Sequence, residues 1–396
     1  MLRSAFIIGS SLPFVLLGQD QAVESPSLPS GFSTGPSLFS LAEEKSKQFG
    51  GLDLSLGLSG RYESNVTQVA SDEDQDWVYT AKIDIGHLLG NSRWNLGARG
   101  NYGYESYQKR DDFSGANYSF ALSGGYQSQK LNASLDLGLS STSGINRIAG
   151  GFIEQKSFKS GLSSTYRFSG KTSLDFSWNQ TSRESRTQDY GDTSSVTAGL
   201  SALWQASPLI SVGPGIRYGV RTGYEEEEFT LFGPTVRFDY KLSTKVALNS
   251  TVGIDRSDSP YSSDDTLLNW AIGLNYRASS LWGFNLQAIQ DTQATLSTGG
   301  GFDQIASYKL SHWRKIRKAQ VEVAVTYEDR SSTDTLSATR VTRDLEYLTL
   351  SAAVRLPVFR ERADMSFYVR QREQTSKNVD LSWDGVQTGL DFTYRF

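Results

Sequence analysis

From Gly51 onward, apolar and polar residues alternate in runs that are separated by polar breaks. The segment 389–396 is typical, because Leu390, Phe392 and Tyr394 alternate with polar residues such as Asp391 and Arg395. Successive side chains of a strand point to opposite sides, so this pattern predicts strands with one apolar and one polar face. We count about 18 such runs, most of ten or more residues, which is the length of a tilted strand that crosses a membrane.

The breaks between the runs are of two kinds that alternate along the chain. Short breaks include GNS at 90–92 and SQK at 128–130, and long polar breaks include STSGINRIAGG at 141–151 and EDRSSTDTLSATRVTRD at 328–344. Outer-membrane barrels have short periplasmic turns and longer loops on the opposite side. We therefore predict an all-β fold, a transmembrane antiparallel up-and-down β-barrel of about 18 strands over residues 50–396, with both ends of the sheet on the periplasmic side.

Two soluble β architectures fit the pattern less well. The hairpins recur about every 40 residues, as propeller blades do, but a blade places four short strands in that length and this chain places two long ones. A two-sheet sandwich turns polar faces to water, whereas here every strand carries an apolar face. A membrane barrel is the architecture in which all the apolar faces point outward together.

The eight tryptophans support the register of the predicted strands. We expect one group near the long-loop ends of the strands and a second group near the short-turn ends. Two such groups match the aromatic belts at the two membrane interfaces. The first group is Trp77, Trp178, Trp270 and Trp383, and the second is Trp94, Trp204, Trp282 and Trp313.

The N-terminal segment has the pattern of an export signal. MLR is followed by the apolar run AFIIGSSLPFVLLG and then by small and polar residues. The run is too short to span a bilayer, and Pro13 argues against a buried strand or helix, which is the alternative. We expect a signal peptide at 1–18 and a periplasmic linker at 19–49, with one possible short helix at 37–48.

Composition adds little evidence for catalysis. Glycine (37 residues) and aromatic residues (12%) are abundant, mean hydropathy is -0.40, and there is no cysteine. The two histidines, His87 and His312, have no evident acid and serine partner, and no nucleotide, hydrolase or zinc motif occurs. We therefore expect no enzyme, no cofactor and no metal site. The net charge of -4 argues against a nucleic-acid partner.

The polar phase of the strands predicts the lining of a water-filled interior. Arg217, Arg221, Arg237 and Lys241 fall on neighbouring strands, where they would form a basic ladder that selects anionic solutes. The alternative is that such charges pair across strands and stabilise the wall, for example Arg237 with Asp255 or Lys241 with Asp239. The acidic runs 72–76 and 225–228 are either cation sites that bridge surface glycolipid or solvated loops.

Two stretches resemble a known family. RYESNVTQ at 61–68 and DWVYTAKIDIG at 76–86 are similar to the start of the β-barrel porin family of Gram-negative outer membranes. The matching positions are Tyr62, Glu63, Asn65, Asp76 and Trp77, while Ser64 stands where the family often has a second acid. The resemblance implies an outer-membrane channel, in a family of which some members accompany exopolysaccharide export, and it implies no catalytic residue.

The prediction is therefore a channel for passive diffusion of small hydrophilic solutes. The alternative is an export conduit or structural barrel that serves polysaccharide or envelope assembly. Outer-membrane lipid and glycolipid are the expected surroundings, and the oligomeric state is left open. The last strand ends on aromatic residues, so we expect Tyr394 and Phe396 to act as a signal for the barrel assembly machinery.

Overall fold

The computed structural model describes most of the chain after residue 50. The described ranges are 51–70, 74–146, 151–187, 191–223, 228–258, 266–294, 302–332, 344–359, 362–376 and 381–396. The predicted signal peptide at 1–18 and linker at 19–49 lie outside them, so both stay predictions. Within the described ranges, no helix is long and apolar enough to cross a membrane.

Eighteen strands of 12 to 17 residues account for nearly all of the described chain. They are β1 Leu52–Glu63, β2 Asp76–Gly90, β3 Trp94–Tyr107, β4 Gly115–Gln127, β5 Leu131–Asn146, β6 Gly151–Arg167, β7 Thr172–Ser185, β8 Thr193–Gln205, β9 Ile210–Thr222, β10 Glu228–Tyr240, β11 Val246–Asp258, β12 Thr266–Ser279, β13 Trp282–Ala294, β14 Phe302–Ile316, β15 Ala319–Ser332, β16 Leu345–Val358, β17 Ala363–Ser376 and β18 Trp383–Arg395. A short 3-10 helix, η1 Asp111–Phe113, precedes β4. The strand count predicted from the alternation is confirmed.

The sheet closes on itself. Each strand pairs antiparallel with its neighbours in the chain, and β1 also pairs with β18 over nine positions, from Ser55↔Arg395 to Glu63↔Gln387. The backbone N–H of Phe396 donates to the carbonyl oxygen of Leu54 at 3.0 Å, which extends this seam by one bond. A closed barrel has no free edge, so every strand has two hydrogen-bonding partners.

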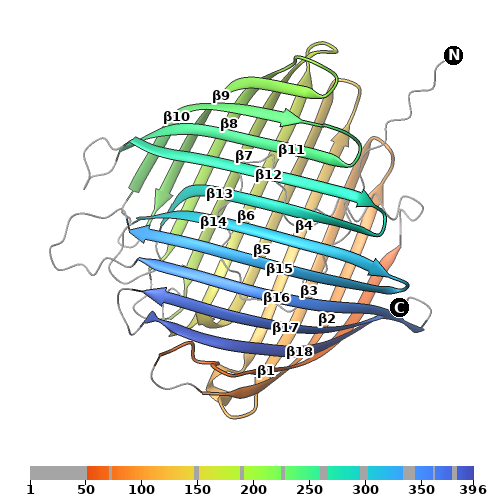
Figure 1. The fold of residues 1–396 in the computed structure, drawn as a ribbon, viewed down its shortest axis with the longest axis vertical. Helices are drawn as coiled ribbons and strands as arrows, with labels where there is room; N and C mark the ends of the chain where they lie inside the picture. The colour runs from red at the N-terminus through yellow and green to blue at the C-terminus, as the bar shows by residue number, and fades with distance from the viewer. Residues whose placement is uncertain are drawn as a thin grey trace.

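The two ends of the barrel differ in their connections. At the short-turn end, on the right in Figure 1, neighbouring strands are joined by turns such as 91–93, 280–281 and 317–318. At the opposite, long-loop end, longer connections such as 64–75 and 108–114 follow the strands. The prediction of a long break at 141–151 is wrong, because β5 and β6 stay paired up to Asn146↔Gly151. Backbone pairing does not require apolar side chains, so this hairpin continues past the apolar part of the wall.

The outer face of the barrel carries an exposed apolar band. Its members include Leu58, Tyr79, Phe120, Ile216 and Phe232, all of which leave more than two fifths of their surface exposed. Side chains of this kind are exposed over a continuous surface only where lipid or another apolar partner covers them. The alternate positions of the same strands face the interior and are mainly charged, hydroxyl-bearing or glycine.

Six of the eight tryptophans belong to the outer face and two do not. Trp77, Trp94, Trp178, Trp204 and Trp282 are exposed, and Trp270 is half-buried on the outer phase of β12. Trp178 lies in the middle of β7, where the outer phase turns polar at Gln180, Ser182 and Glu184. The expectation was wrong for Trp313 and Trp383, which occupy the inward phase and are buried.

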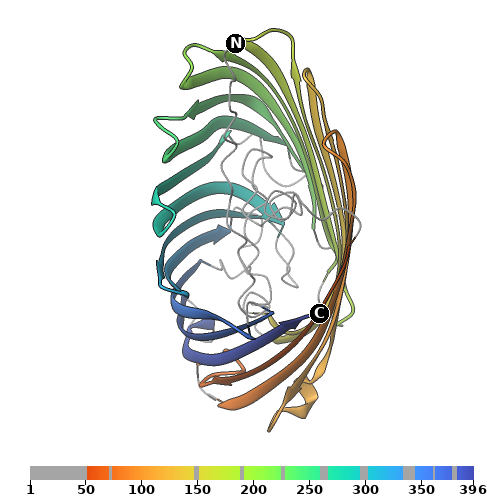
Figure 2. The ribbon, with the colours of Figure 1, turned by 90° about the vertical axis from the view of Figure 1, so that its right-hand side faces the viewer.

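The cross-section of the barrel is elongated (Figure 2). Figure 1, in which the longest axis is vertical, places β9 and β10 at one extreme and β1 at the other. We call the first extreme the corner, defined by Gly213, Pro214, Gly233 and Pro234, and the second the seam, defined by the β1 and β18 pairing.

Candidate functional site

The corner is made by two Gly-Pro pairs on neighbouring strands. Pro214 and Pro234 have no N–H to donate, and the ladder skips pairs beside each of them, between β8 and β9 and between β10 and β11. A Cβ on Gly213 would lie 1.8 Å from the carbonyl oxygen of Ala202, and one on Gly233 would lie 1.8 Å from that of Ile254. Glycine is therefore required at both positions, because the neighbouring backbone occupies the space of a side chain.

Behind the corner, strands that come before it in the chain contact a strand that comes after it. The long-loop half of β13 contacts β8 and β9, although β9 and β13 are separated in the sheet by three strands. Arg217 on β9 donates to Asp291 on β13 at 2.5 Å and to Asp255 on β11 at 3.3 Å. The pair with Asp291 crosses the interior and joins two walls of the barrel, whereas the pair with Asp255 links strands that are two apart in the sheet.

Arg221 completes the connection between the walls. Its side chain is 1% exposed, and its Nε donates to the carbonyl oxygen of Thr292 on β13 at 3.1 Å. Its Nη1 donates to the carbonyl oxygen of Val196 on β8 at 2.9 Å, and its Nη2 lies 3.6 Å from Asp291. A buried guanidinium is tolerated when its donors find acceptors, and here backbone carbonyls accept from Nε and Nη1, while Nη2 has only the ion pair with Asp291. We call Arg217, Arg221, Asp255 and Asp291 the clamp.

An apolar contact lies on the long-loop side of the clamp. The rings of Phe229 on β10 and Phe302 on β14 stack with their centroids 4.6 Å apart. Leu231 is buried with them, and Leu267 on β12 packs against the group. Three strands separate β10 from β14 in the sheet, so this contact also crosses the interior and excludes water beside the clamp.

The four residues predicted to form a basic ladder do not share one environment. Arg217 and Arg221 belong to the clamp, whereas Arg237 pairs with Asp175 on β7 at 2.8 Å and with Asp239 at 3.0 Å. Lys241 is exposed just beyond the end of β10. The predicted pairing of Arg237 with Asp255 is not found, because Asp255 accepts from Arg217 instead. Anion selection by these four residues stays a prediction.

The seam has an ionic cluster of its own. Glu63 on β1 accepts from Arg61 at 2.7 Å and from Arg372 on β17 at 3.1 Å, and Gln387 on β18 donates to it at 2.9 Å. Arg61 also reaches Glu105 on β3 at 3.1 Å. We call Arg61, Glu63, Glu105 and Arg372 the seam cluster. It links strands that lie two apart on one wall, across the β1 and β18 junction.

The positions that carry the family resemblance meet beside the seam cluster. The rings of Tyr62 and Trp77 lie 5.5 Å apart on the outer face. Buried Asp76 accepts from the backbone N–H groups of Trp77, Lys109 and Arg110 at 2.7 to 3.0 Å. Of the predicted acidic run 72–76, the described carboxylates Asp74 and Asp76 are thus both engaged by the chain itself, since Asp74 pairs with Arg110 at 3.1 Å.

Asn65 fixes the connection that leaves β1. Its amide nitrogen donates to the carbonyl oxygens of Val69 and Asp384 at 2.9 and 3.0 Å, which ties this connection to the start of β18. A side-chain amide can do this because it has both donors and an acceptor. The motif residues therefore organise the long-loop end of the seam.

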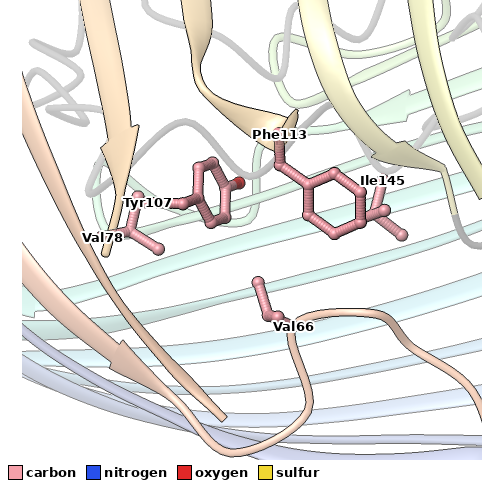
Figure 3. Close-up of a cluster of buried hydrophobic side chains, with 5 residues drawn as sticks. All are labelled: Val66, Val78, Tyr107, Phe113 and Ile145. Atoms are coloured by element: carbon pink, nitrogen blue, oxygen red, sulfur yellow. The ribbon is translucent and has the colours of Figure 1, made fainter. Parts of the chain in front are cut away.

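A small apolar cluster covers the interior beside this end of the barrel. Val66, Val78, Tyr107, Phe113 and Ile145 are buried together and come from the connection after β1 and from β2, β3, η1 and β5 (Figure 3). Arg110 lies 4.0 Å over the ring of Phe113 and donates to Asp112 at 2.9 Å. This hydrogen bond lowers the pKa of Asp112 and raises that of Arg110.

The predicted assembly residues lie at the short-turn end of the seam. The rings of Tyr394 and Phe396 make an edge contact at 5.0 Å, and Phe396 leaves 69% of its surface exposed. Tyr394 pairs with Leu56 across the junction. The two aromatic residues are therefore accessible at the rim of the outer face, and a role as a recognition signal stays a prediction.

The clamp was not predicted from the sequence, although one signal for it was present. Gly-Pro occurs at 213–214 and again at 233–234, inside two successive predicted strands. Proline in a strand interior indicates an interruption of the ladder, and thus a bend. Nothing in the local pattern of Asp291 indicates that it meets a strand four places away.

An apolar outer band, a closed antiparallel sheet and a polar, charge-lined interior together define a transmembrane β-barrel of porin size.

No protein-family model and no curated protein sequence matches this chain. Among solved structures, it is similar to OccAB3 of Acinetobacter baumannii, with 10% identity over 87% of this chain and 99% of that chain and a TM-score of 0.45. OpdK of Pseudomonas aeruginosa, solved with vanillate, has 12% identity over 87% and 98% of the two chains and a TM-score of 0.45. The siderophore receptor PirA of Pseudomonas aeruginosa has 10% identity over 88% and 81% and a TM-score of 0.42. Likeness of this degree adds nothing to the assignment, which rests on the strand pairing and the two faces described above.

Proposed function

We propose that the protein is a water-filled channel of a bacterial outer membrane, through which small hydrophilic solutes diffuse passively. The observation that carries this proposal is the division of each strand between an exposed apolar face and an inward polar face. A barrel of 16 to 18 strands is too wide for its own side chains to fill, so water occupies what the clamp leaves open.

The direct test is electrical. Detergent-purified protein in a planar lipid bilayer should produce stepwise increments of current that rise linearly with voltage. A protein that inserts, as shown by protease protection in liposomes, but carries no current contradicts passive diffusion. That outcome would favour the export conduit, which stays closed until partners open it.

The proposal includes an orientation. Short turns of outer-membrane barrels face the periplasm, so the short-turn end, with Leu52 and Phe396, faces the periplasm and the long-loop end faces outward. The linker at 19–49 would then be periplasmic, after removal of a signal peptide at 1–18. The mass of the mature N-terminal peptide tests the cleavage. Labelling of a single cysteine at 317–318 in intact cells tests the orientation, and labelling there contradicts it.

We further propose that the aromatic residues at the rim serve assembly. Phe396 is exposed and Tyr394 is half-buried on the outer face beside the β1 and β18 junction, where assembly machinery would have access to them. Deletion of Phe396 should lower the amount of folded barrel in the membrane. Ile316→Ser removes another exposed apolar residue at the same end of the barrel, 51% exposed against 69% for Phe396, and should have little effect. Equal folded yields for the two variants contradict the assembly role.

A further inference from the structure

A row of charged side chains crosses six neighbouring strands in the short-turn half of the interior. Asp364 on β17 accepts from Arg355 on β16 at 2.6 Å and from Arg395 on β18. Arg395 pairs in register with Ser55 on β1, whose hydroxyl lies 3.5 Å from Asp84 on β2. Arg99 on β3 lies 3.8 Å from the other oxygen of Asp84. We call Arg355, Asp364, Arg395, Asp84 and Arg99 the arginine row.

The arginine row has more cations than anions. Arg355 and Arg395 share a single carboxylate oxygen, Oδ2 of Asp364, so one negative charge faces two guanidinium groups. Arg99 and Asp84 are at the limit of an ion pair. Three guanidinium groups against two carboxylates leave the row with an excess of one positive charge.

Exposure differs between the two signs of charge. The side chains of Asp364 and Asp84 are 12% and 16% exposed, whereas those of Arg355, Arg395 and Arg99 are 24%, 40% and 46% exposed. At these five residues a solute therefore meets guanidinium N–H groups more readily than the oxygens of Asp364 and Asp84. Each guanidinium has five donors in a planar fork that fits two oxygens of a carboxylate or phosphate.

A lysine extends this surface by one rung toward the long-loop end. Lys82 is exposed, and a Cβ on Gly57 would lie 2.5 Å from its Cε, so the lysine side chain lies across β1 in the space that this glycine leaves. Gly103, its pairing partner on β3, has no side chain to cover it either. Lys82 is thus a further exposed positive charge beside the row, while the exposed Asp53 on β1 supplies a negative one opposite Gly86, the pairing partner of Arg99.

We infer that the arginine row, with Lys82 beside it, binds small oxyanionic solutes, either carboxylates or phosphate monoesters, as they pass the short-turn half of the interior. The inference rests on the proposed channel and names its solute class. It assigns anion selection to the arginine row, whereas the sequence pattern assigned it to Arg217, Arg221, Arg237 and Lys241. Arg217 and Arg221 are buried by the clamp, whereas Arg395 and Arg99 are accessible.

The test compares removal of two row charges with removal of a charge elsewhere in the interior. Arg99→Gln with Arg395→Gln forms the test variant, and Lys159→Gln, which removes an exposed inward cation from β6, is the matched control. The chloride-to-potassium permeability ratio in a planar bilayer should fall about threefold in the double variant and by less than half of that in the control, because local potential sets ion selection. Equal changes in the two proteins overturn the inference.

A second measurement does not depend on conductance. Phosphorus NMR line broadening with inorganic phosphate, and ligand-observed proton NMR with benzoate, report binding to the detergent-solubilised barrel and distinguish the two oxyanions. Wild type and Lys159→Gln should bind at least one probe, and the double variant should bind it about tenfold more weakly. Arg99→Gln alone, whose loose pairing with Asp84 makes misfolding a lesser concern, should bind with an intermediate affinity.

The outcomes separate the two proposals. Probe binding that depends on the row in a protein without conductance overturns the channel and supports the row. Conductance without probe binding in the wild-type protein overturns the row and supports the channel. Heat-modifiable migration on a gel confirms that each variant is folded before either measurement.

Discussion

The seam and the corner use the same chemistry for different tasks. Both bury arginines among carboxylates, but the seam cluster joins strands two apart on one wall, whereas the clamp joins β9 to β13 across the interior. Charge pairs on one wall add to the strength of the sheet, and pairs between walls decide how much of the interior stays open. The role of an inward arginine in this barrel therefore depends on what lies opposite to it.

The largest effect is expected at the seam. Glu63→Ala leaves Arg61 and Arg372 buried without their shared carboxylate, so the free energy of unfolding should fall by about 3 to 5 kcal/mol. Urea titration in lipid vesicles, followed by tryptophan fluorescence, measures this change. Glu373→Ala removes an exposed acid from β17 and should change stability by less than about 0.5 kcal/mol. Similar losses in both variants would show that the seam cluster adds nothing specific.

The next effect concerns the shape of the corner. Gly233→Ala places a Cβ against the carbonyl of Ile254, and the backbone has to move, so stability should fall by about 3 kcal/mol. Gly124→Ala is the matched control, because nothing lies within 4 Å of its Cβ position. The same urea titration compares the two variants. A neutral Gly233→Ala would mean that the corner is not a close backbone approach.

Opening of the clamp should change conductance more than stability. Asp291→Ala removes the carboxylate that β13 offers to β9, while Arg217 keeps Asp255 and Arg221 keeps the carbonyl of Thr292, so stability should fall by about 2 kcal/mol. The walls should separate, and single-channel conductance should rise by about half, as expected when a constriction widens. Amide hydrogen exchange at 290–293 should become faster. Asp258→Ala, at the exposed end of β11, is the control, and an equal rise there contradicts the clamp.

The smallest effect is a pH dependence at the seam end. The pKa of Asp112 is lowered in the folded protein by Arg110, so its contribution is present above the ordinary carboxyl pKa and is lost as pH falls through the lowered value. Exposed pairs contribute little. Hydrogen exchange at Phe113 and Ser114, compared with Asp112→Asn at each pH, should show protection that disappears in acid. Asp111→Asn should retain the wild-type profile, and loss of protection there too would assign the effect to η1 as a whole.

The strands and their apolar and polar faces could be predicted from the sequence, because both depend on residues that are neighbours along the chain. Alternation along Leu390, Phe392 and Tyr394 predicts an outer face whatever the rest of the barrel does. Trp313 and Trp383 show the limit of this reasoning, since their positions near strand ends were right and their faces were not. A one-residue difference in phase moves a side chain from lipid to interior.

The polar, charged character of the interior could be predicted from the sequence, but the contacts and exposure of its individual side chains could not. The sequence indicated that the polar phase with Arg217 and Arg221 points inward, but it contained no information on which inward charges solvent reaches. Exposure depends on contacts between strands far apart in the chain, such as Arg217 with Asp291. Seventy-four residues separate that pair, and no local periodicity records a contact over such a distance.

The sequence by itself determined the number of strands, their two faces and the alternation of short and long connections, because these follow from backbone geometry and local polarity. Tertiary structure alone decided the elongated section, the clamp and the accessibility of the arginine row. The clamp arises where the Gly-Pro corner brings two walls together, whereas the arginine row lies around the seam, away from that contact, and burial of a charge is a property of both walls at once.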